Sequence, residues 1–171
     1  KQVDGRLIEA MPLRLGIVAT DLNSGQGVLF QRGDTGTAVR ASSAVPAIFE
    51  PVRIAGHDYV DGGLVAPVPV NYARQMGAEL VIAVDISSPP EGNPADDTLQ
   101  ILLQTFAIMS QSINRYELRG ADLVVRPNLN GVKSSDFAAR RRAIEAGRLA
   151  MRQLLPKLKQ LIEAGARPVS P

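Results

Sequence analysis

The sequence has no cysteine and a single histidine, His57, among its 171 residues. Without cysteine the chain has no disulfide, no thiolate nucleophile and no cysteine-ligated metal ion. A single histidine also excludes a metal site built from several imidazoles.

Aromatic residues and excess charge are scarce as well. Phe, Trp and Tyr make up 4% of the residues, and the formal net charge at pH 7 is +2. Proteins that bind single-stranded nucleic acid present aromatic stacking platforms, and duplex binders carry clustered positive charge. We therefore expect no nucleic-acid partner.

Long apolar runs are missing too. No run approaches the roughly 18 residues that a membrane-spanning helix needs, and the first residues show neither an initiator Met nor a signal-peptide pattern. We expect a chain without a transmembrane segment that is a piece of something longer. Apolar residues make up 45% and charged residues 21%, which is typical of one globular domain with a real core.

One short stretch combines a strand end, a carboxylate and two glycines. Tyr59 and Val60 predict the end of a strand, and Asp61 stands where that strand stops. Gly62 and Gly63 accept positive φ and let the backbone turn sharply. Another group can approach a carboxylate in such a place closely, which suits a general base. Asp-Gly is equally typical of an ordinary turn, so these residues alone leave both interpretations open.

The rest of the pattern predicts alternating strands and helices. A strand, a helix and an apolar strand between Tyr59 and Ile86 indicate a βαβ unit, so part of the sheet is expected to be parallel. The strands at residues 13–20, 80–86 and 123–126 are expected to be neighbours or near-neighbours in one sheet. In chain order the predicted elements are a hairpin over residues 13–31, a short helix that Asp34 or Thr35 caps and Pro46 ends, a second hairpin over residues 52–60, a helix from Pro69 or Val70 to Met76, and the two buried strands.

Two long helices are expected in the last part of the chain. The first begins near Asp96 or Asp97, and its apolar stripe forms either an ordinary core face or the wall of an acyl-chain site. The second begins near Ser135 or Asp136 and is basic, so it presents a solvated face or lies on an anionic membrane surface. Pro156 is expected to break or kink it. The stripe of the first helix consists of Leu99, Leu102, Leu103, Phe106, Met109, Ile113 and Tyr116.

Several segments together carry a family resemblance: residues 40–49, 59–63, 67–70, 76–78 and 81–85. Through them the sequence resembles the second half of a patatin-like phospholipase domain, of the bacterial patatin and neuropathy-target-esterase-like kind. The resemblance implies an α/β fold with a mixed, partly parallel sheet and helices on both faces, a three-layer arrangement. Residues 1–171 would then be the C-terminal part of a single domain whose N-terminal part is missing.

The resemblance also implies a site and an activity. In that family an Asp-Gly-Gly or Asp-Gly-Ala motif supplies the base of a Ser-Asp dyad. The matching residues here are Asp61 as the base, with Gly62 and Gly63 forming the turn that presents it. The implied protein is a serine-type carboxylic ester hydrolase that cleaves phospholipids or lysophospholipids without a metal or an organic cofactor. The implied location is the bacterial cytoplasm or the periphery of a membrane, with peripheral contact to lipid.

The nucleophile of that family is missing from this sequence. No serine has glycine both two residues before and two residues after it, and Ser42 and Ser43 also lack that pattern. A glycine-rich oxyanion loop is missing as well. The chain alone is therefore expected to be inactive, and its expected partner is the N-terminal part of the same domain, which carries the nucleophile. The alternative is a non-catalytic remnant of the fold that binds lipid or protein.

Two further residues compete for a role at the site. His57 precedes Asp61 by four residues and has the same strand parity, so it is a candidate third member of a triad. It stands beside Gly56 at a predicted hairpin tip, however, where a solvated side chain is usual. Asp85, near the end of the strand at residues 80–86, lacks the glycine pair and is expected to serve hydrogen bonding.

Overall fold

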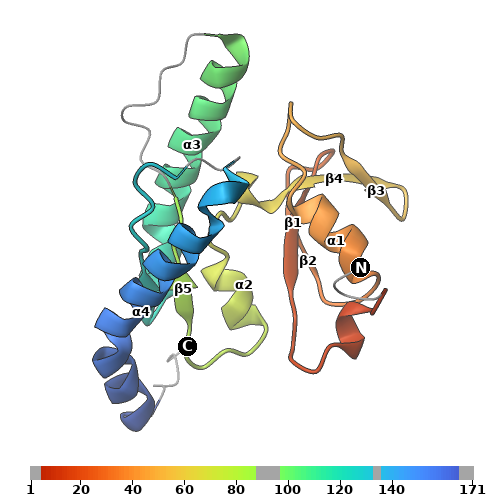
Figure 1. Ribbon diagram of the computed structural model, residues 1–171. Helices are drawn as coiled ribbons and strands as arrows, with labels where there is room; N and C mark the ends of the chain where they lie inside the picture. Colours follow the sequence, from red (N-terminus) through yellow and green to blue (C-terminus); the bar gives the residue numbers. More distant parts are fainter. Residues whose placement is uncertain (1–4, 88–96, 133–135, 166–171) are drawn as a thin grey trace.

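The computed structural model describes residues 5–87, 97–132 and 136–165 and shows a mixed α/β fold (Figure 1). Within these residues the strands form two sheets. The four-stranded sheet has the order β2-β1-β4-β3 with every neighbouring pair antiparallel, and the two-stranded sheet pairs β5 with β6 in parallel. The strands are β1 (Ile17–Asp21), β2 (Gly27–Phe30), β3 (Val52–Ile54), β4 (His57–Asp61), β5 (Ile82–Val84) and β6 (Leu123–Val125). The expected α/β class and both predicted hairpins are confirmed.

The helices begin at the short polar side chains that the sequence indicated. Asp34 accepts a hydrogen bond from the Thr37 amide at 2.6 Å, Asp97 accepts one from the Gln100 amide at 2.8 Å, and Asp136 caps the turn before the last helix. The alternative caps Asp96 and Ser135 lie outside the described residues. The helices are α1 (Thr35–Ser42), α2 (Val70–Gln75), α3 (Thr98–Glu117) and α4 (Arg140–Glu163), with 3₁₀ turns η1 (Ile8–Ala10), η2 (Gly62–Leu64), η3 (Leu118–Gly120) and η4 (Phe137–Ala139).

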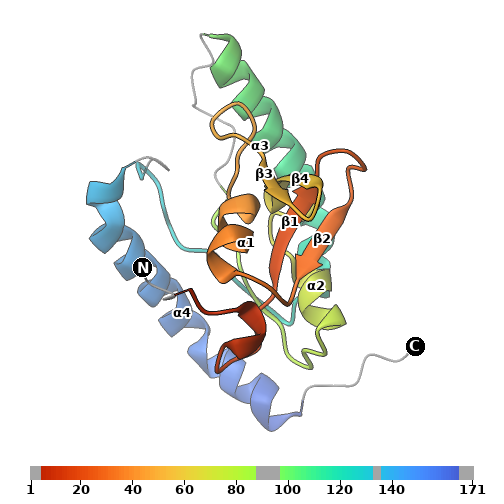
Figure 2. The ribbon, with the colours of Figure 1, turned by 90° about the vertical axis from the view of Figure 1, so that its right-hand side faces the viewer.

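Helices cover both faces of the four-stranded sheet, as expected. On one face α1 packs against β1 and β4, and the core there consists of Ala19, Ala41, Ala44, Val52 and Tyr59. On the other face two glycines of the β1–β2 hairpin leave room for the end of α2: Gly16 lies against the Met76 side chain, and Gly27 against Tyr72. The two helices therefore lie on opposite sides of β1 (Figures 1 and 2).

The expectation that the strands at residues 13–20, 80–86 and 123–126 share one sheet is wrong. Strand β1 pairs with β2 along one edge and with β4 along the other, so it has no free edge for β5 or β6. The last two strands pair with each other instead, in the register Ile82 to Leu123, and α3 forms the crossover that parallel strands need. The βαβ unit therefore begins with β5 and not with β4.

The last helix continues through its proline. Helix α4 runs from Arg140 to Glu163 with Pro156 inside it, so the expected break does not occur. None of its residues is fully buried, and Ile144 and Ile162 are each 61% exposed. The helix contacts β6 and leaves much of its surface in solvent. Among the described helices none is both long and apolar enough to cross a membrane.

The side chain of Arg74 ties α2 to the two-stranded sheet. Its guanidinium group donates to the carbonyl oxygens of Ala78 and Glu79 at 2.9 and 2.8 Å, and to that of Gly120 at 3.1 Å. It also pairs with the Asp122 carboxylate at 2.6 Å, which in turn accepts from the Val81 amide at 2.7 Å. The hydrogen bond from the Val81 amide and the Arg74 guanidinium hold the pKa of Asp122 below its ordinary value.

Replacement of Arg74 by alanine should therefore destabilise the fold. The substitution removes one donor from each of three carbonyl oxygens and the ion-pair partner of Asp122, and we expect the free energy of unfolding to fall by about 2 kcal/mol. Chemical denaturation measures the change. The exposed Arg152 on α4 is the control, because Arg152→Ala should change the stability by less than about 0.5 kcal/mol. Equal effects from the two substitutions would contradict the role of Arg74.

Candidate active site

Asp61 is the last residue of β4, and hydrogen bonds hold its main chain on both sides. Its amide donates to the Ala44 carbonyl at the end of α1, at 3.0 Å. Its carbonyl accepts from the Thr20 hydroxyl of β1, at 2.8 Å. Because the sheet and the helix both fix this residue, the direction of its carboxylate is set by the core of the fold.

The two glycines after Asp61 are needed for space. The expected sharp turn is present, but neither glycine has a positive φ, so the turn does not depend on the left-handed conformation that glycine tolerates. They begin the 3₁₀ turn η2, in which a Cβ on Gly62 would collide with the main-chain carbonyl oxygen of Val18. A Cβ on Gly63 would lie 2.9 Å from the Asp61 carboxylate. Only residues without side chains let the chain pass β1 this closely and turn beneath the carboxylate.

The environment of Asp61 favours its protonated form. The residue is half-buried, and burial raises the pKa of its carboxyl group, although a hydrogen bond from the Gly63 amide to Oδ1, at 2.7 Å, works in the opposite direction. Within the described parts of the chain no Lys, Arg or His forms an ion pair with this carboxylate. A carboxylate in such a setting accepts a proton more readily than one in water.

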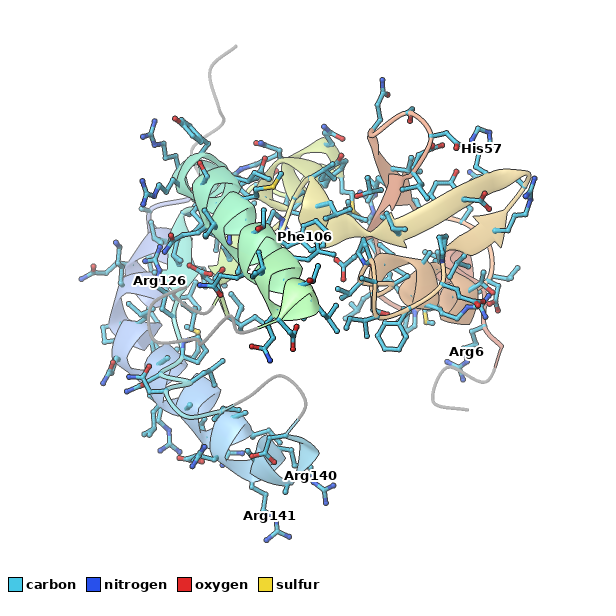
Figure 3. The ribbon with its side chains drawn as sticks, turned by 90° about the horizontal axis from the view of Figure 1, so that it is seen from above. Arg6, His57, Phe106, Arg126, Arg140 and Arg141 are labelled. Carbon is cyan, nitrogen blue, oxygen red and sulfur yellow. The ribbon has the colours of Figure 1, made fainter. Side chains whose placement is uncertain are left out.

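Two cavities meet at Asp61, and Gly63 and Pro67 also line both. The first, of about 470 Å³, lies between η2, the end of β5 and α3. Leu64, Leu103 and Phe106 belong to its lining, which is completed by Val45, Pro46, Val68, Ile86, Ser87, Ala107 and Ser110. Figure 3 shows Phe106 on the side of α3 that faces the four-stranded sheet. The second cavity, of about 410 Å³, lies between β1, α1 and the same turn.

The structure brings Asp61 to the end of β5, as an active site there requires. Ile86 and Ser87 follow that strand and line the first cavity together with Asp61. Ligands of α/β proteins collect at the carboxyl ends of parallel strands. The position of Asp61 is therefore consistent with a binding site, even though β4 and β5 belong to different sheets.

The structure does not bring a nucleophile to Asp61. Ser42 and Ser43 line the second cavity, but the Ser43 hydroxyl donates to the Val39 carbonyl at 2.8 Å. On the side of the first cavity, the Ser110 hydroxyl donates to the Gly63 carbonyl at 3.4 Å. Among the described residues, no serine hydroxyl forms a hydrogen bond with the Asp61 carboxylate.

His57 is not a third member of this site. It begins β4 and Asp61 ends it, so four residues of extended strand, about 13 Å, separate them. Its Nδ1 lies 2.8 Å from the Asp21 carboxylate, and its side chain is 58% exposed. Figure 3 shows it at the far end of the four-stranded sheet from Phe106.

Asp85 serves hydrogen bonding, as expected. Its carboxylate accepts from the Ser87 hydroxyl at 2.6 Å and the Ser87 amide at 3.1 Å, and from the Arg126 guanidinium at 3.1 Å. Burial alone would raise its pKa, but these donors outweigh that effect and hold the pKa below its ordinary value. Asn114 of α3 donates to the Ser87 hydroxyl at 2.7 Å, a link that no sequence motif predicted. In the sequence, the one feature that points to this link is a polar residue, Asn114, on the covered side of α3.

The apolar stripe of α3 is only partly covered. Leu103, Phe106 and Ile113 are half-buried, and the first two line the cavity beside Asp61. The remaining members are exposed: Leu99 by 43%, Leu102 by 38%, Met109 by 52% and Tyr116 by 69%. The covered side of the helix also carries Ser110 and Asn114. The helix therefore forms neither a uniform core face nor a continuous apolar wall.

Asp61 is thus a half-buried aspartate at the end of a strand, followed by a glycine turn, within an α/β fold. Residues 14–74 match the family model described as patatin-like phospholipase, a segment that includes Asp61, Gly62 and Gly63. Through this segment the chain is similar to patatin-like phospholipases, and the relatives that it matches include NTE family proteins.

The relatives are considerably longer than this chain. An uncharacterised NTE family protein of Mycobacterium tuberculosis is 40% identical over 90 residues, which are 53% of this chain and 25% of that protein. A second one from the same organism is 28% identical over 181 residues, which cover 91% of this chain and 31% of the relative. The mouse patatin-like phospholipase domain-containing protein 7 is 33% identical over 88 residues, 50% of this chain and 6% of that protein.

A side chain at Gly62 should disrupt the turn. Because its Cβ would collide with the β1 backbone, we expect Gly62→Ala to lower the free energy of unfolding by at least about 2 kcal/mol. The matched control is Gly147 of α4, where a Cβ meets nothing within 4 Å. Gly147→Ala should raise the stability by about 0.5–1 kcal/mol. Denaturant titration measures the free energy of unfolding of both variants. A Gly62→Ala variant as stable as the wild type would contradict the close approach of Gly62 to the Val18 carbonyl oxygen.

The raised pKa of Asp61 predicts a pH-dependent effect of Asp61→Asn on stability. The folded state holds the proton of Asp61 more tightly than the unfolded state, so the wild type loses stability as the pH rises from the usual pKa of aspartate through the raised one. The variant lacks this loss. The melting temperature of the variant minus that of the wild type should therefore be more positive at about pH 7 than at about pH 3.

Asp34→Asn provides a control of opposite sign. Hydrogen bonds from the Thr37 side chain and amide lower the pKa of Asp34, so the wild type gains stability as the pH rises through that range. The melting temperature of Asp34→Asn minus that of the wild type should become more negative between the same two pH values. Parallel trends in the two variants would contradict the assignment for Asp61.

Proposed function

We propose that the protein is a lipid acyl hydrolase that cleaves carboxylic esters of phospholipids or lysophospholipids by a Ser-Asp dyad. This chain supplies the base, Asp61, and another part of the same domain supplies the serine. The observation that carries the proposal is the half-buried Asp61 carboxylate, which has a raised pKa and opens on two cavities. The match of residues 14–74 to the patatin-like phospholipase family model supports it.

The proposed reaction uses Asp61 twice. Its carboxylate takes the proton of the serine hydroxyl while the serine oxygen attacks the ester carbonyl carbon. The tetrahedral intermediate collapses, the bond to the alcohol breaks, and Asp61 returns the proton to the departing alcohol. Water then attacks the acyl-enzyme in the same manner and releases a fatty acid. The Gly63 amide holds Oδ1 throughout, and Oδ2 has no partner among the described residues, so Oδ2 is the atom that exchanges the proton.

The cavity on the α3 side is suited to an acyl chain. Leu64, Leu103 and Phe106 give it an apolar lining beside Asp61. Burial of methylene groups against such residues contributes about 0.8 kcal/mol each, which would hold a long acyl chain with its ester near the carboxylate. No metal ion or organic cofactor enters the proposal.

A second candidate is a non-catalytic lipid-binding or protein-binding remnant of this fold. It is favoured by the lack of a serine hydroxyl at Asp61 among the described residues. The two candidates differ in one measurable respect, because a remnant would bind lipid in the complete protein without hydrolysing it.

The complete protein should lose most of its esterase activity when Asp61 is replaced by asparagine. The amide keeps the size of the side chain but cannot accept the serine proton, so we expect kcat/KM for a phospholipid ester to fall at least about 100-fold. His57→Ala is the control and should stay within a few-fold of the wild type, because His57 lies at the other end of β4. Full activity of Asp61→Asn would exclude the dyad, and a large loss in His57→Ala would indicate a triad.

Residues 1–171 alone should not hydrolyse a short-chain p-nitrophenyl ester. A base without a nucleophile and oxyanion donors lacks the largest contributions to the rate, since one missing donor already costs about 2.7–4 kcal/mol. Addition of the N-terminal part of the domain as a separate polypeptide should restore activity. Hydrolysis by residues 1–171 alone, unaffected by Asp61→Asn, would overturn the proposed division of the dyad.

A further inference from the structure

A third cavity, of about 660 Å³, lies between the ends of β5 and β6 and the last turns of α3. Three arginines line it among the described residues: Arg115 and Arg119 from the end of α3 and η3, and Arg126 after β6. Asp85 is the carboxylate in the same lining, so the cavity carries an excess of two positive charges. Figure 3 shows Arg126 on the α4 side of α3, across the helix from Phe106.

The guanidinium groups differ in how strongly they are engaged. Arg126 is paired with Asp85. Arg119 lies over the Tyr116 ring, 5.1 Å from its centroid, and this contact orients the group while leaving its N–H donors available. Arg115 forms no ion pair within the described residues. Two guanidinium groups can therefore donate to an anion that enters the cavity.

Asn114, which belongs to the lining of the same cavity, has a buried acceptor without a donor. Asn114 is 4% exposed, and its Oδ1 has no hydrogen-bond partner among the described residues. The Ser87 hydroxyl donates to the Asp85 carboxylate at 2.6 Å, so its other contact, at 2.7 Å, must be a bond that it accepts from the Asn114 amide group. Because the Asn114 nitrogen is the atom that bonds to Ser87, Oδ1 is the side-chain atom that is left without a donor. A buried acceptor of this kind favours a ligand that brings a donor, such as a hydroxyl group.

The arginine-lined cavity adjoins the cavity beside Asp61. Ser87 belongs to the lining of both. A molecule that occupies the two cavities at once therefore places an anionic part near the arginines and an apolar part near Leu103 and Phe106. This division matches an acidic phospholipid, whose charged head group and acyl chains are joined by a short polar segment.

We propose that the arginine-lined cavity binds the phosphate of a phospholipid head group that also carries a free hydroxyl, as in phosphatidylglycerol. The inference rests on the proposed function, because it assigns a place to the head group of the same lipid substrate. The phosphate accepts from Arg115 and Arg119, and the head-group hydroxyl donates to Asn114 Oδ1. A choline head group fits poorly, because its cationic nitrogen would lie among guanidinium groups and it has no hydroxyl to donate.

The test is a binding measurement on the complete protein with soluble probes. Isothermal titration calorimetry with glycerol 3-phosphate compares the wild type with Arg115→Gln/Arg119→Gln. Loss of two charge-assisted donors should weaken binding at least about tenfold. The control is Arg141→Gln, which removes an exposed charge at the far end of α4 (Figure 3) and should leave the affinity within about twofold.

Inorganic phosphate and vesicles distinguish a lipid head group from a free phosphate ion. Glycerol 3-phosphate should bind at least about fivefold more tightly than inorganic phosphate, and Asn114→Leu should remove this preference because the hydroxyl then has no acceptor. The protein should bind phosphatidylglycerol vesicles more tightly than phosphatidylcholine vesicles, and Arg115→Gln/Arg119→Gln should abolish the difference. Equal affinity for the two soluble probes would overturn the head-group proposal, as would equal losses in Arg141→Gln.

Failure of this inference can be separated from failure of the proposed function. Asp61→Asn should bind glycerol 3-phosphate as the wild type does, since Asp61 does not line the arginine cavity. Loss of esterase activity in Asp61→Asn with no binding of the probe by the wild type would leave the dyad intact and refute the head-group site. Probe binding by a wild type that has no esterase activity would support the head-group site and refute the proposed function.

Discussion

The close passage of Gly62 beneath the carbonyl oxygen of Val18 is the contact on which the site depends. It lets the chain leave β4 at once and begin η2, which contacts β1 on one side and α3 on the other. The same turn gives Asp61 its hydrogen bond from Gly63 and places the carboxylate between two cavities. A side chain at this position would separate the four-stranded sheet from α3, and with them the two walls of the site.

Local features of the fold could be predicted from the sequence, whereas the way the sheets divide could not. Helix caps such as Asp34 and Asp97 depend on a few neighbouring residues, and short turns set the hairpins. Membership of a sheet depends on which strand edges are already occupied. Strand β1 pairs along both edges, one of them with β4 some 40 residues later, so it has no edge left for β5. Alternation of apolar residues carries no information on that competition.

The candidate site shows the same contrast. The motif around Asp61 is contiguous, so a resemblance over a short stretch was enough to single it out. The reason for its glycines lies in β1, more than 40 residues earlier, and local turn rules therefore suggested positive φ where the structure needs space. The linked side chains of Asp85, Ser87, Asn114 and Arg126 come from three segments of the chain. No spacing pattern unites them, and only the parallel pairing of β5 with β6 brings them together.

The hydrogen bond between the Thr20 hydroxyl and the Asp61 carbonyl joins residues that are 41 positions apart. Contacts of such long range form only after the intervening chain, here two hairpin turns and α1, has been closed into a loop. Until then the Asp61 carboxyl group is hydrated and titrates as an ordinary aspartate. Its basicity is thus acquired during folding, and the protonation of this one group reports whether β1, α1 and β4 have packed together around it.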